Sequence, residues 1–399
     1  MGFLLQQGYG MMGINEELAS NIQDLGVILS PRALQVNSDI KRLEEHAKSL
    51  QKKNVRVLFD PQFYVPRTNM DKITKFPYFE GLEYSTTEFS SQFAKRFSRN
   101  VINYQINNLG VDEIIIPNIY TNSITSDWYD ISEALIDGAL ETEDKRVKYL
   151  SVPLGPDVVK NRDSFDHLIS ILTQYDVDGY YFVFKSPKNY LSDDEDYLYS
   201  ILDAFISLNL ANKRVMLGYG NQQDLMFASC GVTDIASGNF RNVRSFDPEI
   251  FFDEDVDEGI KRRGIWYYDG NTLSEYKIQQ LTLAYRRGLY NHFGPTCMYC
   301  ENLLQDPNTA LWKEGDAFRH YLFEINRQWS NIIQIPASER IDYVIEILEQ
   351  ANNTLNELID NGVRLGNRAF SEDIMDGTLN ALYAIKADRS YDIEQLKDM

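Results

Sequence analysis

Two aspartates lie at the ends of apolar segments, where their carboxylates could do chemistry on a sugar. Asp60 directly follows the apolar residues 55–59, and Asp234 lies in an apolar stretch that is followed by Arg241 and Arg244. One carboxylate could attack an anomeric carbon while the other transfers a proton to or from the leaving group. The two guanidinium groups could hold the phosphates of that sugar. Each aspartate could instead cap a turn or a helix, which is common after a strand.

Alternating apolar runs and helical patterns predict the elements that would position these residues. Short apolar runs typical of strands occupy residues 27–30, 55–59, 113–116, 146–152, 179–184, 214–218, 234–237 and 264–268. Helical patterns lie between them, for example at residues 126–142 and 194–209. This alternation favours a (β/α)8 barrel, with a doubly wound open sheet as the alternative. No Gly-x-Gly-x-x-Gly turn follows the first strand, which disfavours the dinucleotide-binding form of the open sheet.

The barrel prediction selects candidate residues, because barrel enzymes build their sites at the carboxyl ends of the strands. These residues are Arg32, Asp60, Gln62, Tyr64, Asn118, Lys185, Gly218, Tyr219, Gly220, Asp234, Arg241, Arg244 and Tyr268. We expect residues 1–300 to form the barrel. We expect residues 301–399 to form a mostly helical region packed on the barrel, because an apolar stripe of helical spacing ends there at Gly362.

The composition is that of a globular protein and limits the classes of partner. Of its 399 residues 43% are hydrophobic, and the formal net charge is −20. That charge argues against a generic nucleic-acid coating protein, which binds through clustered lysines and arginines. A local basic track on an acidic body is still compatible with it, and so is a basic partner subunit.

The cysteines and the amino terminus predict a cytoplasmic location. Three cysteines are too few for a disulfide scaffold, which favours a reducing compartment. The start of the chain has no basic flank and only a short apolar run, so we do not expect a signal peptide. No stretch approaches the length of a membrane-spanning helix.

Several motifs, in chain order, carry a resemblance to a known family. Leu217-Gly218-Tyr219-Gly220 precedes Asp224-Leu225, then Gly231-Val232-Thr233-Asp234, then Arg241-x-x-Arg244. This series resembles the tRNA-guanine transglycosylases, which have Met-Gly-Val-Gly-x-Pro-x-Asp-Leu, Gly-Val-Asp-Met-Phe-Asp and Thr-Arg-x-x-Arg. Asp60-Pro61-Gln62-Phe63-Tyr64 falls where the family has Asp-Ser-Gly-Gly-(Phe/Tyr)-Gln. The likeness spans about residues 27–330 and is greatest to the branch that modifies DNA, because the RNA-binding domain of other members is missing.

The resemblance implies a base-exchange glycosyltransferase that replaces guanine in DNA with a 7-deazaguanine such as 7-cyano-7-deazaguanine. Asp234 would be the nucleophile that forms a covalent sugar–enzyme intermediate, and Asp60 would transfer protons. Ala236 and Ser237 stand where the family has its second aspartate, so Asp234 is assigned across a one-residue gap. We therefore expect Asp234→Ala to abolish exchange and leave the fold intact.

The resemblance also implies the substrate contacts. Tyr64 and Leu217 would sandwich the base, and Arg241 and Arg244 would hold backbone phosphate. The remaining substrate-binding positions are Gln62, Asn118, Lys185, Gly218 and Gly220. The target base must leave the helical stack, so single-stranded or flipped DNA is the expected form of the substrate. A helper protein that opens the duplex and a homodimer are further expectations.

A metal site is also implied by the resemblance. Cys297-x-x-Cys300 and His320 match three of the four zinc ligands of the family, and Pro295 stands at the fourth. Thiolate and imidazole suit tetrahedral structural zinc, which usually has four protein ligands. His292 or a water could complete the site. The alternative is two buried free cysteines beside a packed histidine.

Other functions fit the same residues. A transglycosylase-like barrel could bind nucleic acid or a partner protein without catalysis, and the substrate could be tRNA. A hydrolytic glycosidase could use the same two carboxylates.

Overall fold

Eight parallel strands form a nearly closed barrel in the computed structural model, which describes residues 2–34, 38–66, 71–80, 90–188, 190–251 and 264–398. The strands are β1 (Gly2–Gln6), β2 (Gly26–Leu29), β3 (Arg56–Phe59), β4 (Ile114–Ile116), β5 (Lys148–Leu154), β6 (Gly179–Phe184), β7 (Arg214–Leu217) and β8 (Asp234–Ser237). Their order in the sheet is β3-β2-β1-β8-β7-β6-β5-β4. The predicted barrel architecture with a helical C-terminal extension is confirmed.

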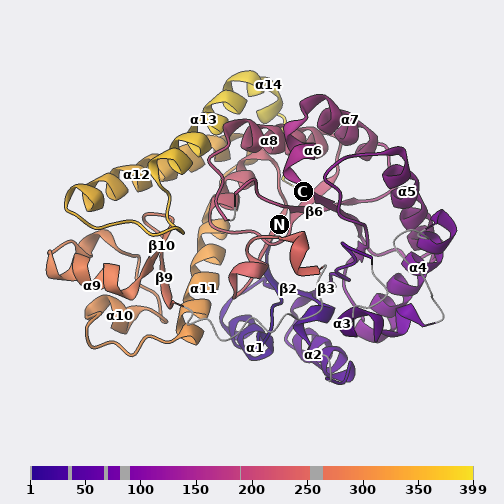
Figure 1. Cartoon of the computed structure of the whole chain (residues 1–399), viewed down its shortest axis with the longest axis horizontal. Helices are drawn as coiled ribbons and strands as arrows, with labels where there is room; N and C mark the ends of the chain where they lie inside the picture. The colour runs from indigo at the N-terminus through magenta and orange to yellow at the C-terminus, as the bar shows by residue number, and fades with distance from the viewer. Residues whose placement is uncertain are drawn as a thin grey trace.

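Helices alternate with these strands and cover the outside of the barrel (Figure 1). They are α1 (Met12–Asn21), α2 (Lys41–Gln51), α3 (Asp71–Thr74), α4 (Ser91–Tyr104), α5 (Ser126–Leu140), α6 (Pro156–Lys160), α7 (Arg162–Leu172) and α8 (Glu195–Leu210). Polar caps start several of them: the side chain of Ser90 accepts from the amide of Phe93, and Asp194 does the same for Tyr197. Apolar faces then direct these helices onto the sheet.

The strands β3 and β4 form no backbone ladder with each other, and the seam between them is closed by one backbone hydrogen bond, from Asp112 N to Val57 O at 2.9 Å, and by side chains. Asp112 Oδ2 also accepts a hydrogen bond from Val57 N at 2.7 Å, on the edge of β3 that faces β4. Gln105 donates to Ile115 O at 2.8 Å and accepts from Ile115 N at 3.1 Å, on the edge of β4. These contacts satisfy backbone groups that an open barrel would otherwise leave unpaired.

Seven of the eight predicted strands belong to the barrel, and the eighth prediction is wrong. The missing barrel strand is β1, which lies between β2 and β8. Residues 264–268 instead overlap β9 (Trp266–Asp269), which pairs antiparallel with β10 (Ser274–Lys277) outside the barrel. An aromatic run favours a strand whatever its partner is, so its composition could not show which sheet it joins.

The interior of the barrel is layered by the alternation of side chains along each strand. Leu4, Ile28, Leu58, Ile115 and Met216 point inward and form an apolar middle layer. The carboxyl end of the barrel above this layer carries the candidate site.

An ion-pair network fills the amino-terminal end of the barrel, below the apolar layer. Arg56 Nη2 lies 2.6 Å from Asp234 Oδ1, and Arg56 Nε lies 3.8 Å from Glu113 Oε2. Arg214 reaches the other oxygen of Glu113 at 3.7 Å. All of these residues stand at or before the first positions of their strands. The network closes the bottom of the barrel, where residues serve stability rather than chemistry.

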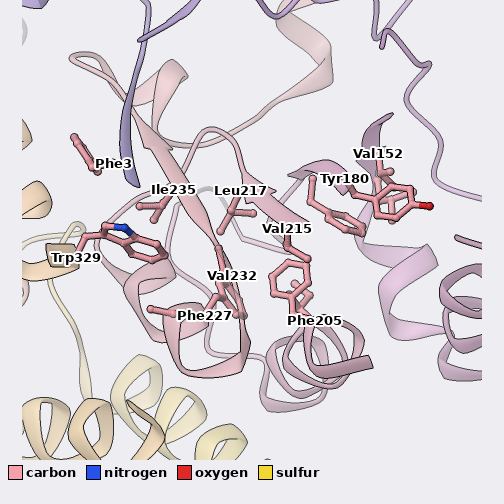
Figure 2. Packing of buried hydrophobic residues seen from close by; sticks show 14 of the residues in the cluster. Phe3, Val152, Tyr180, Phe205, Val215, Leu217, Phe227, Val232, Ile235 and Trp329 are labelled. Carbon is pink, nitrogen blue, oxygen red and sulfur yellow. The ribbon is translucent and has the colours of Figure 1, made fainter. Parts of the chain in front are cut away.

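The C-terminal helices cover the part of the barrel that has no full helix of its own. Between β7 and β8 the chain forms only a short 3₁₀ helix (Gln223–Cys230), against which α11 (Glu314–Ile333) and α12 (Arg340–Asp360) pack. Trp329 of α11 points toward the layer that holds Phe227 and Ile235 (Figure 2). The remaining helices are α9 (Ile278–Arg286), α10 (Glu301–Gln305), α13 (Glu372–Asp388) and α14 (Ser390–Ile393). Among the described residues, no helix is both long and apolar enough to cross a membrane.

The position of Asp234 leads to a stability prediction. Asp234→Ala should lower the free energy of unfolding by about 3 kcal/mol, because it leaves Arg56 without its closest partner at a mostly buried site. Denaturant unfolding measures this. Asp342→Ala, which removes an exposed ion pair with Lys386, is the control and should cost less than about 1 kcal/mol. Equal stability of Asp234→Ala and the wild type would contradict the structural role.

Candidate functional site

A buried carboxylate surrounded by phenol groups lies at the carboxyl end of the barrel. Asp60 directly follows β3, and its Oδ2 accepts a hydrogen bond from Tyr64 Oη at 2.7 Å. Tyr219, just after β7, and Tyr181, on β6, bring their hydroxyls to 3.3 and 3.4 Å from the same oxygen. The amide of Gln62 donates to Oδ1 at 2.8 Å. We call these five residues the Asp60 cluster.

Two residues of the Asp60 cluster have left-handed backbone conformations. Gln62 has φ of 53° and Tyr219 has φ of 56°, although neither is glycine. Their side chains are also hydrogen-bonded to each other: Gln62 Nε2 donates to Tyr219 Oη at 2.9 Å. Left-handed conformations of non-glycine residues are uncommon and are concentrated at functional sites.

A close approach of backbone and ring explains the glycine at position 218. A Cβ on Gly218 would lie 2.3 Å from Tyr181 Oη, so any larger residue would push the phenol away from Asp60. Gly220 is similarly confined by the side chain of Ile235. Gly218 therefore makes room for the Tyr181 phenol, and Gly220 makes room for Ile235.

The surroundings of the Asp60 carboxyl raise its pKa above the ordinary value. Burial raises its pKa to about 6, and hydrogen bonds from Tyr64, the Gln62 amide, Tyr219 and Tyr181 offset part of that effect. Burial also raises the pKa of each of the three tyrosines well above its usual value, so they remain neutral hydrogen-bond donors. A carboxyl with such a pKa is suited to accept and return a proton.

Unpaired polar atoms and an aromatic cover complete the mouth of the barrel. Gln6 Oε1 accepts from Tyr181 Oη at 2.9 Å, but Gln6 Nε2 is buried with no hydrogen-bond partner in the described part of the chain. Ser151 Oγ, on the same interior face of β5 as Tyr149, is unpaired in the same way. Unpaired buried groups are costly and indicate a place for a ligand or water. Phe246 and Phe251 cover the cluster, with ring centroids 4.9 and 5.1 Å from that of Tyr64.

The structure does not bring Asp234 together with Asp60. Asp234 is the first residue of β8, opposite Gly2 and Met216, whereas Asp60 lies beyond the last residue of β3. The two carboxylates therefore lie at opposite ends of the barrel, and the predicted catalytic pair is not assembled. At the carboxyl end of β8 stands Ser237, which is buried and donates to Gly220 O at 2.6 Å.

Leu217 and Asn118 point away from the mouth. Leu217 belongs to the layer between the strands and the outer helices, together with Val215 and Ile235 (Figure 2). Asn118 donates to Ser132 of α5 at 3.1 Å. The alternation of side chains along the strands places both residues on the outer face. The predicted sandwich of a base between Tyr64 and Leu217 is therefore not formed.

The predicted phosphate-binding arginines have different surroundings. Arg244 is 3% exposed, and it donates to the carbonyls of Gly238 and Asn239 at 2.7 Å each. Its guanidinium also pairs with Glu275 at 3.3 Å and lies 3.3 Å from the ring centroid of Tyr321. These contacts hold the loop after β8 in place, and the buried guanidinium of Arg244 is not accessible to a phosphate group.

Two predicted basic residues do lie at the surface near the mouth. Arg241 is exposed, with its guanidinium 5.8 Å from the ring centroid of Tyr190. Lys185, just after β6, lies 3.6 Å from Asp247 and 3.7 Å from Glu249. These carboxylates compete with any phosphate for Lys185.

The three predicted metal ligands are close together outside the barrel. One ligand atom of each of Cys297, Cys300 and His320 lies within 4.8 Å of the others, and all three residues are buried. The Cys300 thiol and His320 lower the pKa of the Cys297 thiol. This cluster could hold a metal ion. His292 does not face it: its Nδ1 lies 3.6 Å from Glu357 at the surface.

The sequence prediction missed residues that no local pattern marked. Tyr181 and Gln6 are inward-facing strand residues, and only the closed barrel brings them to Asp60. Phe246 and Phe251 lie in a loop whose path depends on the buried Arg244. Tyr219 and Tyr268 were among the strand-end candidates, but only Tyr219 lies in the cluster.

Comparisons with models of known protein families and with curated proteins give no match to this chain. Its function is therefore inferred from its own geometry together with the resemblance in its motifs.

The pKa of Asp60 leads to a prediction about pH. The folded pKa of about 6 lies above the ordinary value of 3.8, so the folded state loses stability as pH rises through this interval. Between pH 4.5 and 7.5, Asp60→Asn should gain about 2 kcal/mol in the free energy of unfolding relative to the wild type. Denaturant unfolding at both pH values tests this, and a constant difference would contradict the shifted pKa.

Proposed function

We propose that this protein binds a guanine-type base at the mouth of its barrel, with Asp60 as the recognising carboxylate. A carboxylate suits this role because it can accept hydrogen bonds from the ring N–H and the exocyclic amino group of guanine together. The observation that carries the proposal is the Asp60 cluster, in which a buried, hydrogen-bonded carboxylate lies at the functional end of a barrel.

The surroundings of Asp60 support a flat, polar ligand. Tyr64, Phe246 and Phe251 offer rings on which a base can stack, and stacking does not depend on base sequence. Gln6 Nε2, which has no hydrogen-bond partner among the described residues, is an amide donor in the same mouth and is suited to a base carbonyl. Phe246 and Phe251 must move to admit the base, because they cover Tyr64 in the structure.

Binding without base exchange is favoured because the Asp60 cluster contains a single carboxylate, that of Asp60 itself. Among the residues that the structure describes, Asp60 is the only carboxylate hydrogen-bonded to Tyr64, Tyr181 or Tyr219. A double displacement uses a nucleophile and a separate proton-transfer group. With Asp234 at the other end of the barrel, the transglycosylase-like fold is proposed to act as a reader of guanine or 7-deazaguanine in DNA.

Base exchange on DNA or tRNA is the second candidate function, and the pKa of Asp60 favours it. Above about pH 6 this carboxyl is ionised and could attack C1′ as guanine leaves, after which an incoming 7-deazaguanine would displace it. A tyrosine hydroxyl of the Asp60 cluster would then have to protonate the leaving base.

The base-binding proposal is tested by calorimetry with guanine, 7-cyano-7-deazaguanine and adenine. The wild type should bind the first two bases and reject adenine, which lacks the paired donors. Asp60→Asn should weaken binding at least tenfold, because a hydrogen bond to a charged group contributes about 1.5–3 kcal/mol. Asp247→Asn, at the half-exposed rim, is the matched control and should bind like the wild type. Equal binding of adenine would refute the proposed recognition.

Mass spectrometry of nucleosides separates the two candidate functions. DNA and tRNA are incubated with the protein and each free base. Incorporation by the wild type that Asp60→Asn loses would establish exchange, whereas free guanine without incorporation would indicate a hydrolase. Binding with neither product supports the reader.

We also propose that the cluster of Cys297, Cys300 and His320 binds zinc, because two thiolates and an imidazole form a soft ligand set typical of structural zinc. When bound, the ion would link the segment after α9 to α11.

The zinc proposal predicts one zinc per chain by elemental analysis of the purified protein. Cys300→Ser should lose most of the metal and lower the melting temperature, since structural zinc contributes folding free energy. Cys230→Ser, which changes a buried free cysteine outside the cluster, should keep its zinc. Zinc content unchanged in Cys300→Ser would contradict this site.

A further inference from the structure

We propose that Glu324 is the fourth ligand of the metal site, completing a set of two thiolates, one imidazole and one carboxylate. This inference rests on the proposed metal binding by Cys297, Cys300 and His320. It assigns a role to a residue that neither the spacing of the cysteines nor the resemblance singles out.

Helix geometry places Glu324 on the same face as His320. The two residues are four apart on α11, and side chains at this spacing lie one above the other. Both are 1% exposed, so both point from the helix into the protein and not into solvent. The helix therefore buries an imidazole and a carboxylate on one face. The group of ligand atoms that lie within 4.8 Å of one another comprises Cys297, Cys300 and His320, so the Glu324 carboxylate has to shift toward the three to coordinate the ion.

A backbone contact fixes which nitrogen of His320 is available. His320 Nε2 lies 2.6 Å from the carbonyl oxygen of Tyr268, to which it can only donate. Nδ1 then carries the lone pair, and it lies 3.2 Å from Cys297 Sγ. A histidine held in this way by a carbonyl is the usual arrangement around protein-bound zinc.

Glu324 is a buried carboxylate without the hydrogen bonds that would normally accompany it. Neither of its oxygens accepts a hydrogen bond within the described part of the chain, although Arg327 forms an ion pair with one of them. A buried carboxylate left in this state is costly, and coordination of a cation removes that cost.

The charges balance with Glu324 in the site. Two thiolates and a carboxylate around a divalent ion leave one net negative charge, and the guanidinium of Arg327 compensates it. The two alternatives for the fourth position are less favourable. His292 faces Glu357, and a water ligand would leave the buried Glu324 carboxylate with only its ion pair to Arg327.

The experiment is the visible absorption spectrum of the cobalt(II)-substituted full-length protein between pH 6 and 9. With Glu324 as a ligand the wild-type ligand-field bands should not change with pH or on addition of azide, because no water is bound. Glu324→Gln should open the fourth position to water, whose ionisation near pH 7 and replacement by azide then alter the bands. Glu314→Gln, in the first turn of the same helix, is the matched control and should behave like the wild type.

Zinc affinity provides the second measurement. Glu324→Gln should bind zinc at least tenfold more weakly than the wild type, whereas Glu314→Gln should not differ. Wild-type cobalt bands that titrate or respond to azide would show that water holds the fourth position and would overturn the assignment of Glu324. A wild-type protein that binds neither zinc nor cobalt would instead refute the metal site itself.

Discussion

The parallel arrangement of the eight strands is the constraint on which the rest of the structure depends. All first residues meet at one end of the barrel and all last residues at the other. Along each strand, successive side chains point alternately into the barrel and outward, so every second side chain faces the interior. Asp234 and Arg56 therefore close the amino-terminal end as an ion pair, and Asp60 reaches the carboxyl end. Strand β1 pairs with both β2 and β8, and this pairing fixes where the neighbouring strands begin and end.

The mouth of the barrel concentrates features that stability alone does not explain. A carboxylate is buried with three phenols, and two residues of the cluster have uncommon backbone conformations. The inward-facing amide of Gln6 has no partner for its NH2 group within the ranges that the structure describes. At the opposite end of the barrel, by contrast, the charged side chains are paired with one another, as stability requires. The contrast between the two ends supports a ligand site around Asp60.

The region outside the barrel is organised around α11, which links two parts of the chain. One side of this helix packs Trp329 toward the barrel, and its His320 lies beside the two cysteines. The hairpin of β9 and β10 contributes Glu275, which pairs with Arg244 and Arg368 and so connects the loop after β8 to the C-terminal region. A metal ion between the cysteines and α11 would stabilise the same junction.

The sequence by itself determined the alternation of strands and helices and the barrel class, because these depend on local apolar periodicity. The grouping of the cysteines with His320 came from the resemblance of their motif to that of a known family. It also pointed to Asp60, Gln62 and Tyr64, which follow one strand directly. Only the tertiary structure decided which end of the barrel each aspartate occupies, which face Leu217 and Asn118 take, and that Arg244 is buried. The physical reason is register: a shift of a few residues within a short strand moves a side chain to the other end of the barrel or to its other face, and the apolar pattern does not encode that shift.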